Sequence, residues 1–269
     1  MYRRSLLKSL WIGVALLLTS AAFASATSPQ LQYHVEIGNL AQKTLHIQLK
    51  LTAPPADKTA FEIPAWTPGY YQILHYEKKI ANLSAKDDKK NPLTLTHPTP
   101  RRWEVSNPNH VSSLNVEYDL TADDSGYGFF GSSLLPNTGY INGASAFLYP
   151  AEYKEAKISL TMSLPTGWQV ATGLDTASQR AKSHSTFSFQ AENYDQFIDC
   201  PIQFGKFDTF HFTVSRTPFQ CVLVGDHKVN TPQFQKNLTT VALEAEKILG
   251  RFPFKRYVFL FHCGGGGFG

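Results

Sequence analysis

The chain has 269 residues, of which 42% are hydrophobic and 13% aromatic, and its formal net charge is +4. This length is enough for one large domain, or for one domain and part of a second. The lysines and arginines are scattered rather than gathered into a basic stripe, so the composition argues against a nucleic-acid partner.

The first 26 residues have the pattern of a secretory signal peptide. Arg3, Arg4 and Lys8 form a positive start, an apolar run extends over Leu10–Leu18, and small residues before and at Ala26 offer a cleavage site. The run is shorter than the about 20 residues that cross a bilayer. We therefore predict a periplasmic or secreted protein with no membrane span after cleavage. An uncleaved N-terminal anchor and a twin-arginine export signal are the alternatives.

From residue 31 to about residue 224 the sequence is typical of β-strands. Apolar and polar residues alternate over Leu45–Leu51, Leu114–Tyr118 and Ile158–Leu164, which is the period of a half-buried strand. Prolines, glycines and asparagines mark turns between such segments. We predict a mainly β fold, an antiparallel β-sandwich or large curved sheet, for the domain over 27–228.

Two segments in this region combine aromatic rings with special backbone positions. Phe61–Tyr71 contains two prolines, which fix φ, and Gly69, which accepts a positive φ. We interpret it as a corner of the core, with an aromatic platform for a ligand as the alternative. Asn193–Ile202 alternates apolar and polar residues, which predicts a strand edge or a connecting corner. Three tryptophans are expected in the core: Trp66, Trp103 and Trp168.

The pattern changes at Thr231, which we predict to be a helix N-cap followed by Pro232 at the first helical position. Apolar residues at steps of four and three then mark one buried stripe: Phe234, Leu238, Val241, Ala245 and Ile248. Gly250 is expected to end the helix. Tyr257–Phe261 is a continuous apolar run that predicts a strand buried on both faces. We place a domain boundary near residues 226–230, so that residues 229–269 begin an α/β domain without completing it.

The sequence contains no recognisable catalytic constellation. None of its nine histidines is followed by glutamate, and no two are spaced to hold a metal from one helix face, so we predict no metal site. There is no G-x-S-x-G motif, and no cation next to Cys200 would activate it as a nucleophile. Cys200 and Cys221 could form a disulfide that leaves Cys263 unpaired, or all three could be small buried residues. We assign no catalytic residue.

Four segments of the chain occur in an order that is characteristic of one peptidase family. They are Phe61–Tyr71, Pro165–Thr172, Asn193–Ile202 and Gly250–Leu260. Together they resemble the front part of the glycyl aminopeptidases, which belong to the gluzincin zinc metallopeptidases. The resemblance covers essentially the whole chain after residue 26. One departure is Cys200, where a small serine-like residue is expected.

The resemblance implies an N-terminal β domain, a thermolysin-like zinc catalytic domain and a PDZ-like domain, with release of N-terminal residues, often glycine, from peptides. The family's zinc ligands lie in a His-Glu-x-x-His helix and a later glutamate, and this sequence has no such motif. We therefore expect a truncated, inactive N-terminal fragment without zinc, whose peptide substrate belongs to a full-length relative. Only Gly265, Gly266 and Gly267 are expected to border a substrate cleft. The alternatives are a free-standing module that binds peptide or carbohydrate, and an interaction partner of a full-length paralogue.

Overall fold

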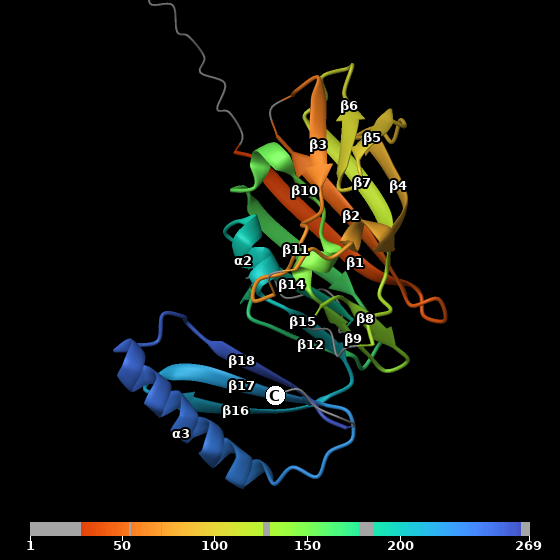
Figure 1. Cartoon of the computed structure of the whole chain (residues 1–269). Coiled ribbons are helices and arrows are strands. Elements are labelled where there is room, and N and C mark those ends of the chain that lie inside the picture. Colours follow the sequence, from red (N-terminus) through yellow and green to blue (C-terminus); the bar gives the residue numbers. More distant parts are fainter. Residues whose placement is uncertain (1–27, 54, 71, 126–129, 178–184, 265–269) are drawn as a thin grey trace, which may run out of the picture.

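The computed structural model describes residues 28–264, apart from residues 54, 71, 126–129 and 178–184. Figure 1 shows a large β-rich unit and, below it, a smaller unit in which one long helix lies against a sheet. None of the helices among the described residues is both long enough and apolar enough to cross a membrane.

A seven-stranded sheet is the centre of the large unit, with the strand order β13-β14-β11-β1-β2-β7-β4. Its strands are β1 (Gln30–Asn39), β2 (Thr44–Thr52), β4 (Ile80–Asp87), β7 (Ser113–Thr121), β11 (Lys157–Ser163), β13 (Asp175–Thr176) and β14 (Thr186–Ala191). The three alternating segments predicted as strands lie in β2, β7 and β11, which confirms them. All neighbours are antiparallel except β1 and β11, which pair in parallel.

Two four-stranded sheets complete the large unit. One has the order β10 (Tyr149–Pro150), β3 (Lys58–Glu62), β6 (Arg102–Ser106) and β5 (Leu95–Thr99). The other has the order β12 (Gln169–Thr172), β15 (Ile202–Gly205), β9 (Thr138–Ile141) and β8 (Ser133–Leu135). All three sheets send alternate residues into one hydrophobic core, which includes Phe61, Val105 and Phe204. The predicted mainly β fold is therefore confirmed.

Three buried tyrosines fix an irregular segment inside this core. The hydroxyls of Tyr118, Tyr194 and Tyr33 donate to the backbone carbonyls of Ala146, Phe147 and Leu148 at 2.8, 2.6 and 2.6 Å, respectively. The three carbonyls belong to the last residue of the short helix α1 (Gly143–Ala146) and to the two residues between it and β10. Because buried backbone oxygens need hydrogen-bond donors, the tyrosines allow this segment to cross the core.

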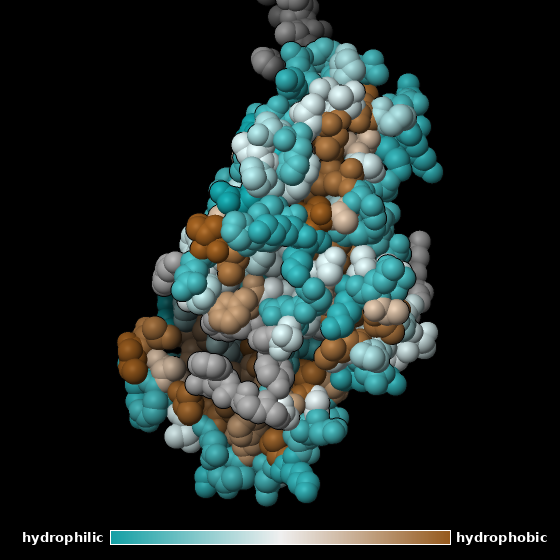
Figure 2. All heavy atoms as spheres, turned by 45° about the vertical axis from the view of Figure 1, so that its right-hand side comes forward, coloured by the Kyte–Doolittle hydropathy of each residue, from teal (hydrophilic) through white to brown (hydrophobic). Residues whose placement is uncertain are grey.

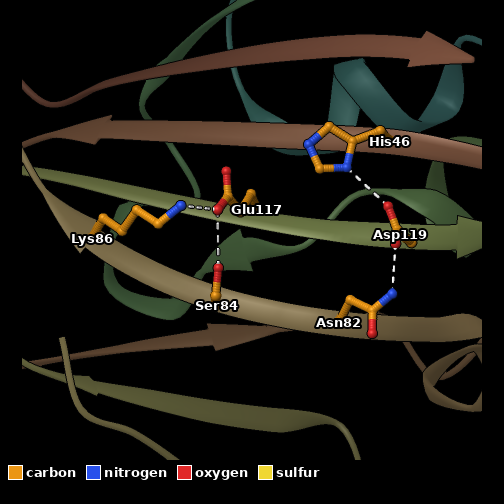
Figure 3. Close-up of polar contacts among 6 residues, drawn as sticks. All are labelled: His46, Asn82, Ser84, Lys86, Glu117 and Asp119. Atoms are coloured by element: carbon orange, nitrogen blue, oxygen red, sulfur yellow. Dashed lines mark hydrogen bonds and ion pairs between the residues drawn. The ribbon is translucent and has the colours of Figure 1, made fainter. Parts of the chain in front are cut away.

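Polar side chains on the outer face of the large sheet join β2, β7 and β4 (Figure 3). Asp119 receives hydrogen bonds from Asn82 at 2.7 Å and from His46 at 2.8 Å. These contacts hold the pKa of Asp119 below its ordinary value. Glu117 accepts hydrogen bonds from Lys86 and Ser84. Each carboxylate thus binds partners across neighbouring strands and helps to fix their register.

The two aromatic segments differ in part from their predictions. Gly69 has a φ of +83° as expected, and the buried Thr67 forms a hydrogen bond with Asn142 at 3.0 Å, so this segment is a corner of the core. Trp66 is 47% exposed, which is contrary to prediction, because Thr67 rather than Trp66 points inward here. Trp103 and Trp168 are buried as predicted.

The segment from Asn193 to Ile202, predicted as a strand edge or corner, instead begins with a short helix. This helix, α2, spans Tyr194–Asp199. The Asn193 side chain accepts a hydrogen bond from the backbone N–H of Gln196 at 2.9 Å, which is the N-cap interaction. Tyr194 and Phe197, three residues apart, are both buried, so the apolar spacing that seemed alternating is one helical face. Two 3-10 helices lie in the same unit, η1 (Tyr76–Lys79) and η2 (Ala151–Tyr153).

The smaller unit is a three-stranded sheet covered by one helix. Its elements are β16 (Asp208–Val214), β17 (Thr217–Val224), α3 (Thr231–Leu249) and β18 (Tyr257–His262). β16 and β17 form an antiparallel hairpin, and β18 pairs with β17 in parallel after the α3 crossover. The unit has its own core, which includes Phe219, Cys221 and Leu238. β16 and β17 precede the predicted domain boundary near residues 226–230, and β18 follows it, although the three strands share one sheet. The position of that boundary stays a prediction.

The predicted helix is confirmed, but its N-cap is Asn230 rather than Thr231. The Asn230 side chain accepts from the backbone N–H of Gln233 at 3.2 Å. Gly250 ends the helix with a φ of +75°, as expected. The buried face contains Leu238 and Ala242.

The predicted apolar stripe of α3 is wrong at its C-terminal end, because Val241 and Ile248 are 61% and 86% exposed. The neighbouring Leu243 and Leu249 are exposed as well. Figure 2 shows apolar side chains, in brown, at several places on the surface of the smaller, lower unit. β18, expected to be buried on both faces, is only half-buried, because it lies at the edge of the sheet.

Replacing the observed N-cap, Asn230→Ala, should destabilise α3 by about 1 kcal/mol, because it removes the partner of the Gln233 N–H. Urea unfolding followed by the helical circular dichroism signal measures this loss. Thr231→Ala is the matched control, and its effect should be clearly smaller. An equal or larger loss in the Thr231 variant would show that the cap is misassigned.

Candidate functional site

A cleft of about 730 Å³ lies where the two units meet. Its floor is one face of the sheet formed by β12, β15, β9 and β8. Ser133, Tyr140 and Gln203 are register partners across β8, β9 and β15, and all three line the cleft. The opposite face of the same strands carries Leu134 and Phe204 into the core. The volume is within the range of small-molecule and peptide sites.

The facing wall of the cleft is formed by the C-terminal ends of the parallel strands β17 and β18. Val224, His262 and Cys263 line it there. Ligands of open α/β sheets bind outside the carboxyl ends of parallel strands, so this is the expected position for a site. Gly225 has a φ of +88°, and a Cβ atom added to it would lie 2.6 Å from the Cys263 oxygen. Only glycine therefore fits where β17 leaves the sheet.

Gln203 joins the floor to the facing wall through a hydrogen bond with His262. Its side chain is buried and its Nε2 lies 2.7, 3.0 and 3.2 Å from three acceptors, the Thr138 hydroxyl and the carbonyls of Gly139 and Phe204. This fixes the orientation of the amide, so Oε1 faces His262 Nε2 at 2.8 Å. Because Oε1 can only accept, His262 carries a hydrogen on Nε2.

Tyr140 stands beside this pair on the cleft floor. Its ring contacts the His262 ring edge-to-face, with 5.6 Å between ring centroids and 85° between ring planes. Burial, and to a smaller extent the negative charge of Asp124, raise the pKa of Tyr140 to about 12. At neutral pH the side chain is therefore a neutral phenol that can donate a hydrogen bond.

The remaining lining of the cleft carries both signs of charge. Two lysines and three aspartates contribute to it: Lys43, Lys206, Asp124, Asp208 and Asp226. Leu135, Phe207 and Leu223 add apolar surface. Such a mixed lining suits a ligand that has polar backbone groups and apolar side chains, and it does not favour a highly charged ligand of one sign.

A functional site could also bind a metal ion or use a reactive cysteine. No group of three or more His, Cys, Asp or Glu side chains in the described part of the chain is placed to hold a metal ion. The three cysteines are free thiols, so the possible disulfide between Cys200 and Cys221 is not formed. Burial raises the pKa of Cys200 to about 11 and that of Cys221 to about 12. None of them therefore has the properties of a nucleophilic thiolate.

The glycines predicted to border a substrate cleft come directly after the last residue that the structure describes. Gly265, Gly266 and Gly267, like the predicted signal peptide over residues 1–26, fall outside the described residues. β18 and Cys263, which precede these glycines, do border the cleft. Tyr140, Gln203 and His262 were not predicted from the sequence. A possible signal was Gln203 itself, an amide between Ile202 and Phe204 in an apolar segment.

Comparison with known proteins finds similar structures among peptidases. An aminopeptidase N family protein from Idiomarina loihiensis has a similar structure, with a TM-score of 0.81 and 25% sequence identity over 89% of this chain and 40% of that chain. An M1 zinc metallopeptidase from Deinococcus radiodurans matches with a TM-score of 0.53 and 11% identity over 88% of this chain and 58% of that one, which shows the fold alone. The chain thus spans 40% of the length of the first protein and 58% of the second.

The search of curated proteins found no match. A family model described as the Peptidase M61 N-terminal domain matches residues 32–206, which is more than half of the chain. This match and the similar structure of the aminopeptidase N family protein confirm the resemblance to the front part of an aminopeptidase. The chain therefore belongs to the peptidase M61 family, and residues 32–206 are its N-terminal domain.

Proposed function

We propose that the chain is the N-terminal part of an exported aminopeptidase and that the cleft between its two units binds peptide. The match to the Peptidase M61 N-terminal domain is the observation that carries this proposal. The mixed polar and apolar cleft between the two units supports it, because a short peptide needs both kinds of contact. The resemblance to glycyl aminopeptidases supports a preference for glycine and other small N-terminal residues.

We further propose that the 269 residues do not cleave peptides by themselves. The His-Glu-x-x-His motif, which supplies zinc ligands and a general base in such enzymes, does not occur in this sequence. In a full-length relative, zinc would lower the pKa of its bound water and so supply hydroxide near neutral pH. Export through a signal peptide over residues 1–26 belongs to the same proposal and is supported by its positive, apolar and small-residue sections.

Two measurements on the purified chain test the proposal. Titration of the isotope-labelled protein with the tripeptide Gly-Ala-Ala should shift the NMR signals of cleft residues such as Ser133 and Cys263. A peptidase assay on glycine p-nitroanilide with added zinc should give no turnover above the buffer rate. Absence of any peptide-dependent shift would contradict a role in peptide binding, and robust turnover would contradict the proposed lack of activity.

A further inference from the structure

We propose that Tyr140 is a ligand-contacting residue of the cleft, whose hydroxyl donates a hydrogen bond to a carbonyl oxygen of the bound peptide, and that Gln203 is the positioning residue behind it. This inference rests on the proposed peptide-binding function and adds the group that recognises the peptide backbone. It also assigns a role in the cleft to the β-rich unit, through β9 and β15.

The first observation is where Tyr140 stands. It lies in the middle of the cleft floor, with Ser133 on β8 and Gln203 on β15 as its register partners. Its ring contacts the His262 ring, but no hydrogen bond links its hydroxyl to another described residue. A phenol oxygen in such a place retains hydrogen-bonding capacity that a ligand can use.

The second observation concerns the chemistry of the acceptor. Burial and the charge of Asp124 keep the phenol protonated at neutral pH, so its hydroxyl can donate. The negative charge of Asp124, which also lines the cleft, disfavours a ligand carboxylate nearby. A peptide carbonyl has no net charge and avoids this repulsion. The backbone of an extended peptide therefore fits this position better than its C-terminal carboxylate.

The third observation is the set of contacts that hold the Tyr140 ring in place. The Gln203 amide is oriented by its three acceptors, and its oxygen binds His262 Nε2 at 2.8 Å. His262 in turn presents its ring at 85° to Tyr140. Gln203 and Tyr140 belong to the large unit and His262 to the small one, so the same contacts position the phenol and join the two walls of the cleft.

The test begins with Tyr140→Phe, which removes the hydroxyl and keeps the ring contact. The dissociation constant of Gly-Ala-Ala amide should rise about 3- to 10-fold, which is the usual effect of losing one hydrogen bond. Tyr149→Phe is the matched control. The Tyr149 hydroxyl lies outside the cleft and donates a hydrogen bond of 3.1 Å to Glu62. The peptide affinity of this control should equal that of the unmodified protein.

Thioamide peptides identify the acceptor directly, because sulfur is a weaker acceptor than oxygen. Replacing the contacted carbonyl oxygen of the tripeptide by sulfur should weaken binding to the unmodified protein and should not weaken binding to Tyr140→Phe any further.

Gln203→Met tests the positioning role. It should weaken peptide binding only while Tyr140 is present. It should also abolish the preference of His262 for the Nε2–H tautomer, which nitrogen NMR measures.

The outcomes separate this inference from the function on which it rests. If the unmodified protein binds no peptide, the proposed function fails and this inference fails with it. If the protein binds peptide and Tyr140→Phe binds it equally well, only the inference fails. If Gln203→Met weakens binding equally with Tyr140 and with Phe at position 140, Gln203 does not act through Tyr140.

Discussion

The free energy of unfolding should fall steeply above about pH 10, because three tyrosines in the core can ionise readily only when the protein unfolds. Burial raises the pKa of Tyr33, Tyr118 and Tyr194 well above the ordinary value. In the unfolded chain each phenol ionises near pH 10. The folded protein keeps protons that the unfolded chain releases, so the stabilisation is fully present below about pH 10 and is lost as the pH rises further.

The expected size of this effect follows from the number of protons involved. Each tyrosine contributes about 1.4 kcal/mol per pH unit, so the three together contribute about 4 kcal/mol per pH unit to the slope. Tyr76, Tyr140 and Tyr149, whose pKa values are raised by burial as well, make the total slope steeper. Urea unfolding at several values between about pH 8 and pH 11 measures the slope. The phenolate absorbance of these residues should appear together with unfolding rather than before it.

Tyr118→Phe is the control for this alkaline transition. It should reduce the slope by about 1.4 kcal/mol per pH unit, because one ionisable group is removed. Near neutral pH it should cost about 1–3 kcal/mol, since the carbonyl of Ala146 loses its donor in a buried place. If the slope above pH 10 is unchanged in this variant, Tyr118 is not one of the groups that cause the alkaline transition.

Phe204→Ala should lower the free energy of unfolding of the large unit by about 3–5 kcal/mol. Phe204 is fully buried beneath the cleft floor. Its ring packs against Trp168, with ring centroids 6.0 Å apart, and fills the space above Gly139, where an added Cβ would lie 2.2 Å from the ring. With no side chain at Gly139 to refill the space, the substitution leaves a cavity.

Leu135→Ala is the matched control for Phe204→Ala. Leu135 lies in the same sheet but is 47% exposed, so its truncation should cost well under about 1 kcal/mol. Urea unfolding monitored by tryptophan fluorescence measures both variants. Similar losses in the two variants would mean that the sheet below the cleft is not packed as described.

Strands β2, β7 and β11 were predictable because each has one buried face. Alternation over Leu45–Leu51 and Ile158–Leu164 is a local property, and these segments are strands β2 and β11. The parallel pairing of β1 with β11 was not predictable, because period-2 alternation does not state which strand is the neighbour. The segment Asn193–Ile202 was misassigned because a single helical turn and an alternating strand share their apolar positions over so few residues.

The helix α3 shows a different limit of sequence reasoning. Its length and its glycine end were recognised from local signals, but its buried face was recognised only in part. Phe234 and Leu238 pack against the sheet as predicted, yet the buried line continues through Ala242 and leaves Val241 and Ile248 exposed. Which of two neighbouring lines is buried depends on how the helix docks, and this is set by the sheet.

The candidate site was the least predictable part, since its residues come from distant segments. Tyr140, Gln203 and His262 form no sequence motif, and each has a common structural role when considered alone. They meet because β9 and β15 pair in the large unit and β18 docks beside them. The predicted cleft glycines follow β18, so the sequence indicated this end of the strand but not the residues opposite it.

The parallel pairing of β1 with β11 has a consequence for the order of folding. Gln30, near the start of the described chain, pairs with Lys157, so β1 has one open edge until most of the large unit has been synthesised. Contacts so distant in sequence require the closure of a long loop and slow the search for the native state. Until then β1 can pair only with β2, and its second edge remains available to the wrong partner. A nascent chain of this protein therefore depends on protection against aggregation until β11 arrives.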